Sequence, residues 1–269
     1  MRNEILNYFS RTHAQYIHAR GELGTRVLIQ ILNCQPNENV LEIGFGTGTT
    51  LLHIYSNNKK TKFYGLEQSS LMYKKAKARL NFSLIGKSIK LGLMEQKNKI
   101  SFPANSFDKI YLESVLGIQE GDDFVNLLIE ISRVLKPSGI LVMNETIWLN
   151  TTSVDELLHV NNFCKPSFGV VQCNSEYPYV QNWIDLLTRL NFRCESIIRL
   201  DEVKDSIKSE FRFPYRLLSL IYTGIGKIKS ILIPSMIKEK KNFYQKMKQI
   251  NPENKPLMEG IVIKAVNKK

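Results

Sequence analysis

The chain has 269 residues, of which 43% are hydrophobic and 10% aromatic, so it can bury a core and is not a disordered chain. Its formal net charge is +12, and residues 201–269 hold 15 lysines and arginines against 7 acids, an excess of 8. This basic region favours contact with nucleic acid, an anionic lipid surface or an acidic substrate, unless it is only a solvated lysine-rich surface.

The first 24 residues alternate polar and apolar side chains and contain no apolar signal core, so no export signal is expected. The four cysteines are scattered without metal-like spacing, at Cys34, Cys164, Cys173 and Cys194. They indicate reduced thiols in a cytoplasmic protein.

Helices and strands are predicted to alternate through about residue 150. Residues 3–33 have helical apolar spacing, and "CQPNEN" after them forms a turn. The strands predicted next are 40–44, 62–67, 89–93, 107–114 and 140–146, and the helices are 49–57, 69–80, with a cap at Ser69 or Ser70, and 122–135. This alternation predicts an α/β fold with a parallel sheet covered by helices on both faces.

Beyond residue 150, a helix is expected over 177–192 and strands over 193–200 and 259–266. The basic stretch between these strands is too long for a simple connection, so we expect a helical cap inserted there. The single domain then divides into an N-terminal helical segment (1–36), a core (37–150), the remainder of the sheet (151–202), the cap (203–257) and the last strand (258–269).

A glycine-rich loop, "GFGTG", follows the first predicted strand. Gly44, Gly46 and Gly48 alternate, and Thr49 stands where a dinucleotide loop would have its third glycine. A P-loop is excluded because no Lys-Ser/Thr pair follows the glycines. Glu42, inside the strand, would repel a phosphate and would stabilise a cationic ligand.

The second strand also ends on an acid, Glu67, which can accept both hydroxyls of a ribose. A ribose at one end and positive charge at the other describe S-adenosylmethionine (SAM), whose sulfonium and amino groups are cationic. The glycines then allow the backbone to approach the methionine part of SAM, unless they serve only the turn.

Four segments in order, "VLEIGFGTGTT", "FYGLEQS", "FPANSFDKIYLES" and "ISRVLKPSGILVMNE", resemble the successive motifs of class I SAM-dependent methyltransferases. The resemblance covers roughly residues 38–146 and implies a Rossmann-like sheet of seven strands with the last one antiparallel. It also implies that Glu42, Gly44, Gly46 and Gly48 frame the methionine moiety, that Glu67 holds the ribose, and that Gln68 and Ser69 border it. S-adenosylhomocysteine is the implied product of the cofactor.

The chain departs from the family after the third strand, where an acid often lies near the adenine amino group. Here the sequence reads "LGLMEQKNKISFP". Met94 is expected to pack on adenine and Glu95 to accept its amino group, with an ordinary surface glutamate as the alternative.

The segment after the fourth strand, "YLESVLGI", bears on the methyl acceptor. It lacks the Asn/Asp-Pro-Pro-aromatic motif of base amino-methylases, and no Pro-Cys pair suggests a cytosine nucleophile. It is similar to small-molecule and lipid methyltransferases, including the sterol and tocopherol C-methyltransferase group. By that resemblance Glu113 steers a cationic transition state or takes a proton; alternatively, it is a structural carboxylate beside SAM. Those relatives often have a histidine near the place of Gly117.

Three further residues are candidates near the cofactor. His13, with Tyr16 and the neighbouring His18, lies in an N-terminal segment that can fold over SAM, although solvated histidines are the alternative. The predicted catalytic residues are Glu113, His13 and Tyr177, and the predicted cofactor-binding residues also include Tyr16 and Glu113. No cluster of histidines and acids indicates a metal, so a metal-free reaction is expected.

The function predicted is SAM-dependent methyl transfer to a small, lipophilic acceptor at carbon or oxygen, of isoprenoid or other natural-product type. One alternative is an RNA or protein methyltransferase that docks through the basic cap. The other is a non-catalytic relative that binds SAM or a partner.

Residues 211–237 of the cap combine a polar stripe with an apolar side. The stripe holds Ser219, Thr223, Lys227 and Ser230, and the apolar side holds Leu217, Leu220, Ile221, Ile225, Ile228 and Leu232. Mid-segment lysines, glycines and Pro234 argue against a membrane-spanning helix. Packing on the sheet, a lid over the acceptor pocket, and a membrane-surface helix stay open; packing combined with a lid is the expectation.

Overall fold

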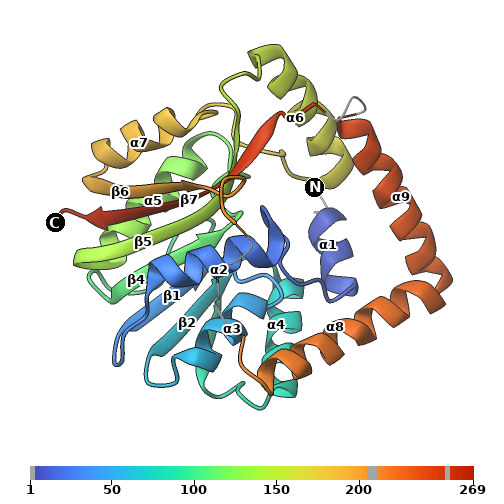
Figure 1. Ribbon diagram of the computed structural model, residues 1–269, viewed down its shortest axis with the longest axis horizontal. Coiled ribbons are helices and arrows are strands. Elements are labelled where there is room, and N and C mark those ends of the chain that lie inside the picture. The colour runs from blue at the N-terminus through green and yellow to red at the C-terminus, as the bar shows by residue number, and fades with distance from the viewer. Residues whose placement is uncertain (1–3, 205–206, 208–210, 252–254) are drawn as a thin grey trace.

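A sheet of seven strands forms the centre of the computed structural model, which describes residues 4–204, 207, 211–251 and 255–269 (Figure 1). The strand order is β3-β2-β1-β4-β5-β7-β6. The strands are β1 (Asn39–Ile43), β2 (Lys62–Glu67), β3 (Ile89–Leu93), β4 (Phe107–Glu113), β5 (Leu135–Trp148), β6 (Phe192–Arg199) and β7 (Met258–Asn267). Only β7 runs antiparallel to its neighbours β5 and β6, which confirms the predicted α/β, Rossmann-like fold.

Nine helices are found in the described part of the chain: α1 (Glu4–Arg11), α2 (Gly21–Leu32), α3 (Thr49–Asn57), α4 (Ser70–Phe82), α5 (Asp122–Val134), α6 (Val154–Phe168), α7 (Val180–Arg189), α8 (Tyr215–Leu232) and α9 (Pro234–Ile250). Ser69 caps α4 by accepting the amide hydrogen of Met72 at 3.3 Å. Helix α6 was not predicted, although Ser153 and Glu156 form a capping box at its start.

The core lies on both faces of the sheet because successive strand residues point to opposite sides. Val40 of β1 packs in one cluster with residues of α2, α3 and α4. Leu41 and Ile43 pack in a second cluster with residues of α5 and α7. A residue's position in its strand therefore decides which helical layer it meets.

The N-terminal segment differs from the single helix predicted over residues 3–33. Helix α1 ends at Arg11, and residues 12–20 form a loop in which His13, Tyr16 and Arg20 have positive φ angles of 52°, 43° and 55°. The carbonyl of Ala14 accepts the Thr47 hydroxyl at 2.6 Å, so the loop crosses the glycine-rich turn. This tertiary contact interrupts the helical pattern.

Helices α8 and α9 form the described part of the predicted cap, whose residues 205, 206, 208–210 and 252–254 lie outside the described residues. They run along the outer side of the molecule, where α8 packs on α3 and α4 and α9 packs on α6 (Figure 1). Within the described ranges no single helix is long and apolar enough to cross a membrane. The pair α8 and α9 passes such a test together by length and composition, although it is bent by 95°.

Candidate functional site

A cavity of about 1020 Å³ opens at the carboxyl ends of β1, β2, β4 and β5. Strand order reverses between β1 and β4, and ligands of open α/β sheets bind at such a switch point. The glycine loop, the ends of β2 and β4, the loop before α2, helix α1 and residues 169–172 all contribute to the wall. The cavity therefore lies where the motifs predicted the cofactor.

The glycine loop is held by Glu67. One carboxylate oxygen accepts the amide hydrogen of Gly46 at 2.8 Å, and the other accepts that of Ser69 at 2.8 Å. Glu67 is 7% exposed and lines the cavity, and burial raises its pKa despite these backbone donors. Each oxygen has a further lone pair for a ligand hydroxyl.

The loop itself fits the methionine part of SAM at Gly46. Gly46 has φ +51°, and a Cβ there would meet only the Ile17 side chain, at 3.6 Å, on the cavity side. A buried acid can accept the ribose hydroxyls of SAM, and glycine backbone without side chains allows its methionine part to approach closely. When bound, SAM supplies an electrophilic methyl group; Glu67 would hold its ribose and the glycine loop its methionine part.

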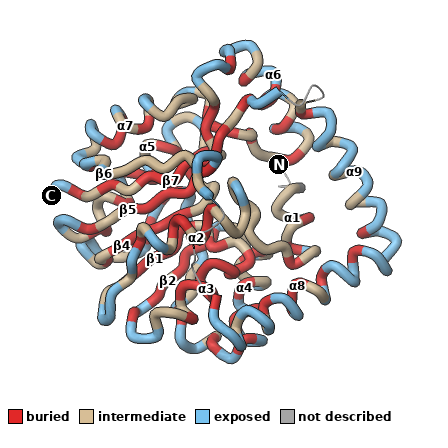
Figure 2. The backbone as a smooth tube through the Cα atoms, in the orientation of Figure 1, coloured by how far each residue is buried: buried red, intermediate tan, exposed pale blue. Residues whose placement is uncertain are grey.

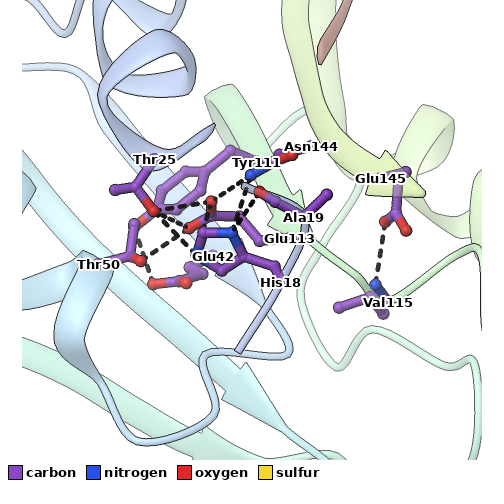
Figure 3. A network of polar contacts seen from close by, with 10 residues as sticks. All are labelled: His18, Ala19, Thr25, Glu42, Thr50, Tyr111, Glu113, Val115, Asn144 and Glu145. Atoms are coloured by element: carbon purple, nitrogen blue, oxygen red, sulfur yellow. Dashed lines mark hydrogen bonds and ion pairs between the residues drawn. The ribbon is translucent and has the colours of Figure 1, made fainter. Parts of the chain in front are cut away.

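Strand register places a buried polar network under the loop before α2 (Figure 3). Glu113 of β4 and Asn144 of β5 are register partners, and both point to the side of the sheet covered by α2 and α3. The Glu113 carboxylate accepts hydrogen bonds from Thr50 at 2.7 Å, Asn144 at 2.8 Å and Thr25 at 3.0 Å. With 5% of its side chain exposed, Glu113 is enclosed by these donors.

His18 completes this network. Its Nε2 lies 3.2 Å from a Glu113 oxygen and 2.9 Å from the Thr25 hydroxyl, and its Nδ1 lies 3.1 Å from the Asn144 amide nitrogen. The same Nδ1 also lies 3.4 Å from the carbonyl oxygen of Ala19. Both ring nitrogens are then engaged with protein groups, although His18 also lines the cavity.

Glu42 occupies the same side of the sheet, one strand away. It accepts the Tyr111 hydroxyl at 2.8 Å, and these two residues are register partners in β1 and β4. Burial, followed by the neighbouring Glu113, raises the pKa of Glu42 well above its ordinary value. Both carboxyl groups border the cavity, so a cationic ligand there would be favoured.

Glu145 points to the opposite face because it follows Asn144 in β5. Its two oxygens accept the amide hydrogens of Val115, Leu116 and Gly117, each at 3.0 Å. Burial raises its pKa to about 7, against these three hydrogen bonds. Glu145 thus fixes the loop that follows β4, on the expected acceptor side.

Most sequence-predicted residues meet at this cavity. The lining includes Tyr16, Glu42, Gly44, Gly46, Glu67, Gln68, Ser69, Met94 and Glu113. Their assignment as cofactor ligands stays a prediction, because a shared cavity wall does not identify the ligand. Tyr16 is largely buried, and burial raises the pKa of its hydroxyl.

Four predicted residues lie outside the described cavity lining. Gly48 begins α3 with φ +76°, and a Cβ there would lie 2.9 Å from that of Ala76, so this glycine serves the packing of α3 on α4. Glu95 is exposed, which agrees with the alternative that it is an ordinary surface glutamate. His13 stacks on Tyr222 at 4.5 Å, and Tyr177 stacks on Phe124 at 5.1 Å.

The predicted lid is also corrected. None of the described residues of α8 or α9 lines the cavity, and Leu220 and Ile221 are about half exposed. The described residues of the cap do not line this cavity, whereas residues of α1 and residues 169–172 do. The buried residues of α8 are Ser219, Tyr222, Thr223, Gly226 and Ser230, three of them with hydroxyl groups of the predicted polar stripe.

Arg79, which was not predicted as a structural residue, explains why the polar side of α8 faces inward. Its fully buried guanidinium donates to the carbonyls of Thr47 and His13, both at 2.9 Å, and to the hydroxyls of Ser219 at 2.8 Å and Thr223 at 3.1 Å. One side chain thereby joins the glycine loop, the N-terminal loop and α8. The sequence shows Arg79 only as one more cation in a lysine-rich helix.

Thr25, Thr50, Asn144 and Glu145 were missed as well, and one signal for them existed. Asn144 and Glu145 are consecutive polar residues directly after the apolar run 140–143, near the end of the strand predicted over 140–146, where a parallel sheet presents its functional groups. The two threonines gave no comparable signal. They come from α2 and α3, and only the packing of these helices brings both hydroxyls to Glu113.

Residues 41–143 match the family model described as a methyltransferase domain. A curated relative, demethylmenaquinone methyltransferase of Geobacillus stearothermophilus, is 30% identical over 161 residues. The match covers 56% of this chain and 64% of the relative, less than two thirds of the relative's length.

Two solved structures share the fold. The [4+2]-cyclase SpnF is 14% identical, with a TM-score of 0.67 over 98% of this chain and 93% of that chain. Geranyl diphosphate C-methyltransferase from Streptomyces coelicolor, solved with Mg²⁺, geranyl diphosphate and S-adenosyl-L-homocysteine, is 14% identical, with a TM-score of 0.58 over 90% of this chain and 78% of that chain. The family model, the order of the motifs and the cavity at the switch point agree on the cofactor, SAM. These comparisons support a class I SAM-dependent methyltransferase domain in this chain.

Proposed function

We propose that this protein transfers the methyl group of SAM to a small, lipophilic acceptor, at carbon or oxygen. The observation that carries the proposal is the composition of the wall of the cavity at the switch point. It combines the glycine loop and buried acids with apolar side chains of Ile5, Leu6 and Phe9 from α1 and of Val170 and Val171. An apolar wall beside a polar cofactor site suits an acceptor that leaves water.

The chain's own residues then have separate tasks. Glu67 binds the ribose and orders the glycine loop, while Glu42 and Glu113 favour a cationic ligand. Glu145 holds the loop at 115–117, which aligns the acceptor side of the cavity. Because both nitrogens of His18 are engaged, we assign His18 and Glu113 to positioning rather than to proton removal.

The names of the relatives support an acceptor of isoprenoid type. One is a demethylmenaquinone methyltransferase and one a geranyl diphosphate C-methyltransferase, and both names describe prenyl compounds. The cyclase among the structural relatives shows that this fold also serves other reactions. The test must therefore separate cofactor binding from methyl transfer.

The test incubates the purified protein with SAM and a panel of prenylated quinones, prenyl diphosphates and phenols. Mass spectrometry then follows S-adenosylhomocysteine and the methylated product. We expect both to form with at least one lipophilic acceptor and neither to form with RNA or a protein acceptor. Product from RNA or protein alone would overturn the acceptor class, and failure to bind SAM in calorimetry would overturn the function.

Gly46→Val and Glu67→Ala provide the matched variants. Valine at Gly46 adds a side chain facing the cavity at φ +51°, so SAM affinity is expected to be lost. Glu67→Ala should cost about 2–3 kcal/mol of S-adenosylhomocysteine binding through lost charged hydrogen bonds. Glu95→Ala, which changes an exposed acid outside the cavity lining, is the control and should bind normally.

A further inference from the structure

Helix α8 presents its apolar side to solvent. Leu220, Ile228, Ile231 and Leu232 are 51%, 57%, 62% and 71% exposed, and Leu217, Ile221 and Ile225 are also exposed. In a regular helix these seven residues lie on one side. Figure 2 shows the outer course of α8 and α9 with long exposed stretches. An apolar surface of this extent marks an interaction site in most proteins.

The inward side of α8 is fixed by polar contacts, which is why the apolar side faces outward. Arg79 donates to Ser219 and Thr223, and a Cβ on Gly226 would lie 2.3 Å from the Thr12 carbonyl oxygen. Turning the helix would unpair a buried guanidinium and drive side chains into the N-terminal loop. The outward apolar side is therefore built into the fold.

Cations flank this apolar surface. Lys227 and Lys229 are exposed and fall on opposite edges of the apolar side. From Tyr215 to Ile250 the sequence holds eight lysines and arginines and one acid, Glu239, which pairs with Arg11 at 3.0 Å. Lysines on both edges of an apolar helical side reach phosphate groups while the apolar residues enter the acyl boundary.

We propose that the exposed side of α8 docks this protein on the surface of a membrane that contains anionic lipid, with the helix lying in the plane of the interface. Charge favours this occupant over a second copy of the chain. Two copies meeting through α8 would bring like charges together, in a protein whose net charge is already +12. Anionic headgroups complement the same lysines.

The test is flotation of the full-length protein with vesicles of phosphatidylcholine alone or with about 30% phosphatidylglycerol. We expect binding to the anionic vesicles that weakens as salt is raised. Leu220→Ser/Ile228→Ser should weaken it by about tenfold or more. The control is Ile129→Ser/Val154→Ser, at positions 47% and 60% exposed on α5 and α6, and it should bind as the unchanged protein does.

Charge is tested by Lys227→Gln/Lys229→Gln against Lys87→Gln/Lys90→Gln, all four of them exposed. Only the first pair should weaken vesicle binding. Three results would each overturn the proposal. The first is no binding to anionic vesicles, and the second is an equal loss of vesicle binding in Leu220→Ser/Ile228→Ser and in the control Ile129→Ser/Val154→Ser. The third is a dimer that depends on α8 in sedimentation velocity, without lipid binding. Binding of S-adenosylhomocysteine is measured in every variant, so a failure here is separate from a failure of the proposed methyl transfer.

Discussion

Glu113 shows that the contacts of a carboxylate, and not its residue type, distinguish a catalytic role from a supporting role. A carboxylate after the fourth strand was predicted either to act on the substrate or to support the cofactor site. In the structure it accepts hydrogen bonds from three side chains and contacts His18, with 5% of its own side chain exposed. These contacts favour the supporting role, in which Glu113 holds the loop before α2 against α3 and β5.

Glu113→Ala is expected to lower the free energy of unfolding by about 3–5 kcal/mol, because it leaves several buried donors unpaired. Urea denaturation measures this loss, with Glu95→Ala as the exposed control. Glu113→Gln keeps one acceptor oxygen and should retain most of the methyl-transfer rate. A fall of about 100-fold in kcat for Glu113→Gln, with S-adenosylhomocysteine affinity and stability unchanged, would instead support the catalytic role.

At the scale of elements, α8 has the two sides that its pattern predicted but in the opposite orientation, and Lys227 of the predicted polar stripe is exposed. The sequence separated the polar stripe from the apolar side, and hydrophobic burial then placed the apolar side inward. The structure reverses this because Arg79 needs Ser219 and Thr223 as acceptors. The partners of Arg79 lie 140 and 144 residues away in the sequence, so local patterning carried no sign of them.

Arg79→Met tests this organisation. We expect residues 12–18 and the first turns of α8 to lose protection in hydrogen-exchange mass spectrometry, because their shared donor is gone. The unfolding free energy should fall by about 3 kcal/mol, as for other buried charged groups whose partners are left behind. Lys77→Met, an exposed cation on the same helix, is the control. Identical exchange in both variants would show that Arg79 does not hold α8.

The helices and strands of the core could be predicted where residues close in the sequence determine them. The predicted start of α3 and the predicted bounds of β2 match the structure, because Gly48 precedes the helix and Glu67 ends the strand. The interrupted N-terminal helix was not predictable, since the break depends on the contact of Ala14 with Thr47. The sequence motifs predicted the residues of the glycine loop and the end of β2 that line the cavity, whereas the part of the wall formed by α1 and residues 169–172 depends on tertiary packing.

At the scale of the whole molecule, buried acidic residues gather at one cavity in a protein whose net charge is positive. Glu42, Glu67, Glu113 and Glu145 all border the cavity. Burial raises the pKa of Glu42, Glu67 and Glu145, so the fold retains protons there that the unfolded chain releases. A cationic ligand in the cavity would favour the ionised forms of these acids and so lower their pKa values again.

A measurable pH dependence follows for Glu145, whose pKa rises from 4.5 to about 7 on folding. Its protonated form stabilises the fold fully below pH 4.5, and that stability is lost as pH rises to about 7. The loss amounts to about 3 kcal/mol. Urea midpoints across this range should fall for the unchanged protein by more than for Glu145→Gln. Parallel curves for the two proteins would contradict the assignment.

The guanidinium of Arg79 has a thermodynamic consequence for the molecule as a whole. It holds Thr47 of the glycine loop and Ser219 of α8 at the same time, so the order of one segment depends on the order of the other. Coupling between two binding events is reciprocal: a bilayer that fixes α8 would strengthen cofactor binding by the same factor by which the cofactor strengthens membrane attachment. The lipid surface would then act as an allosteric effector of the cavity without entering it.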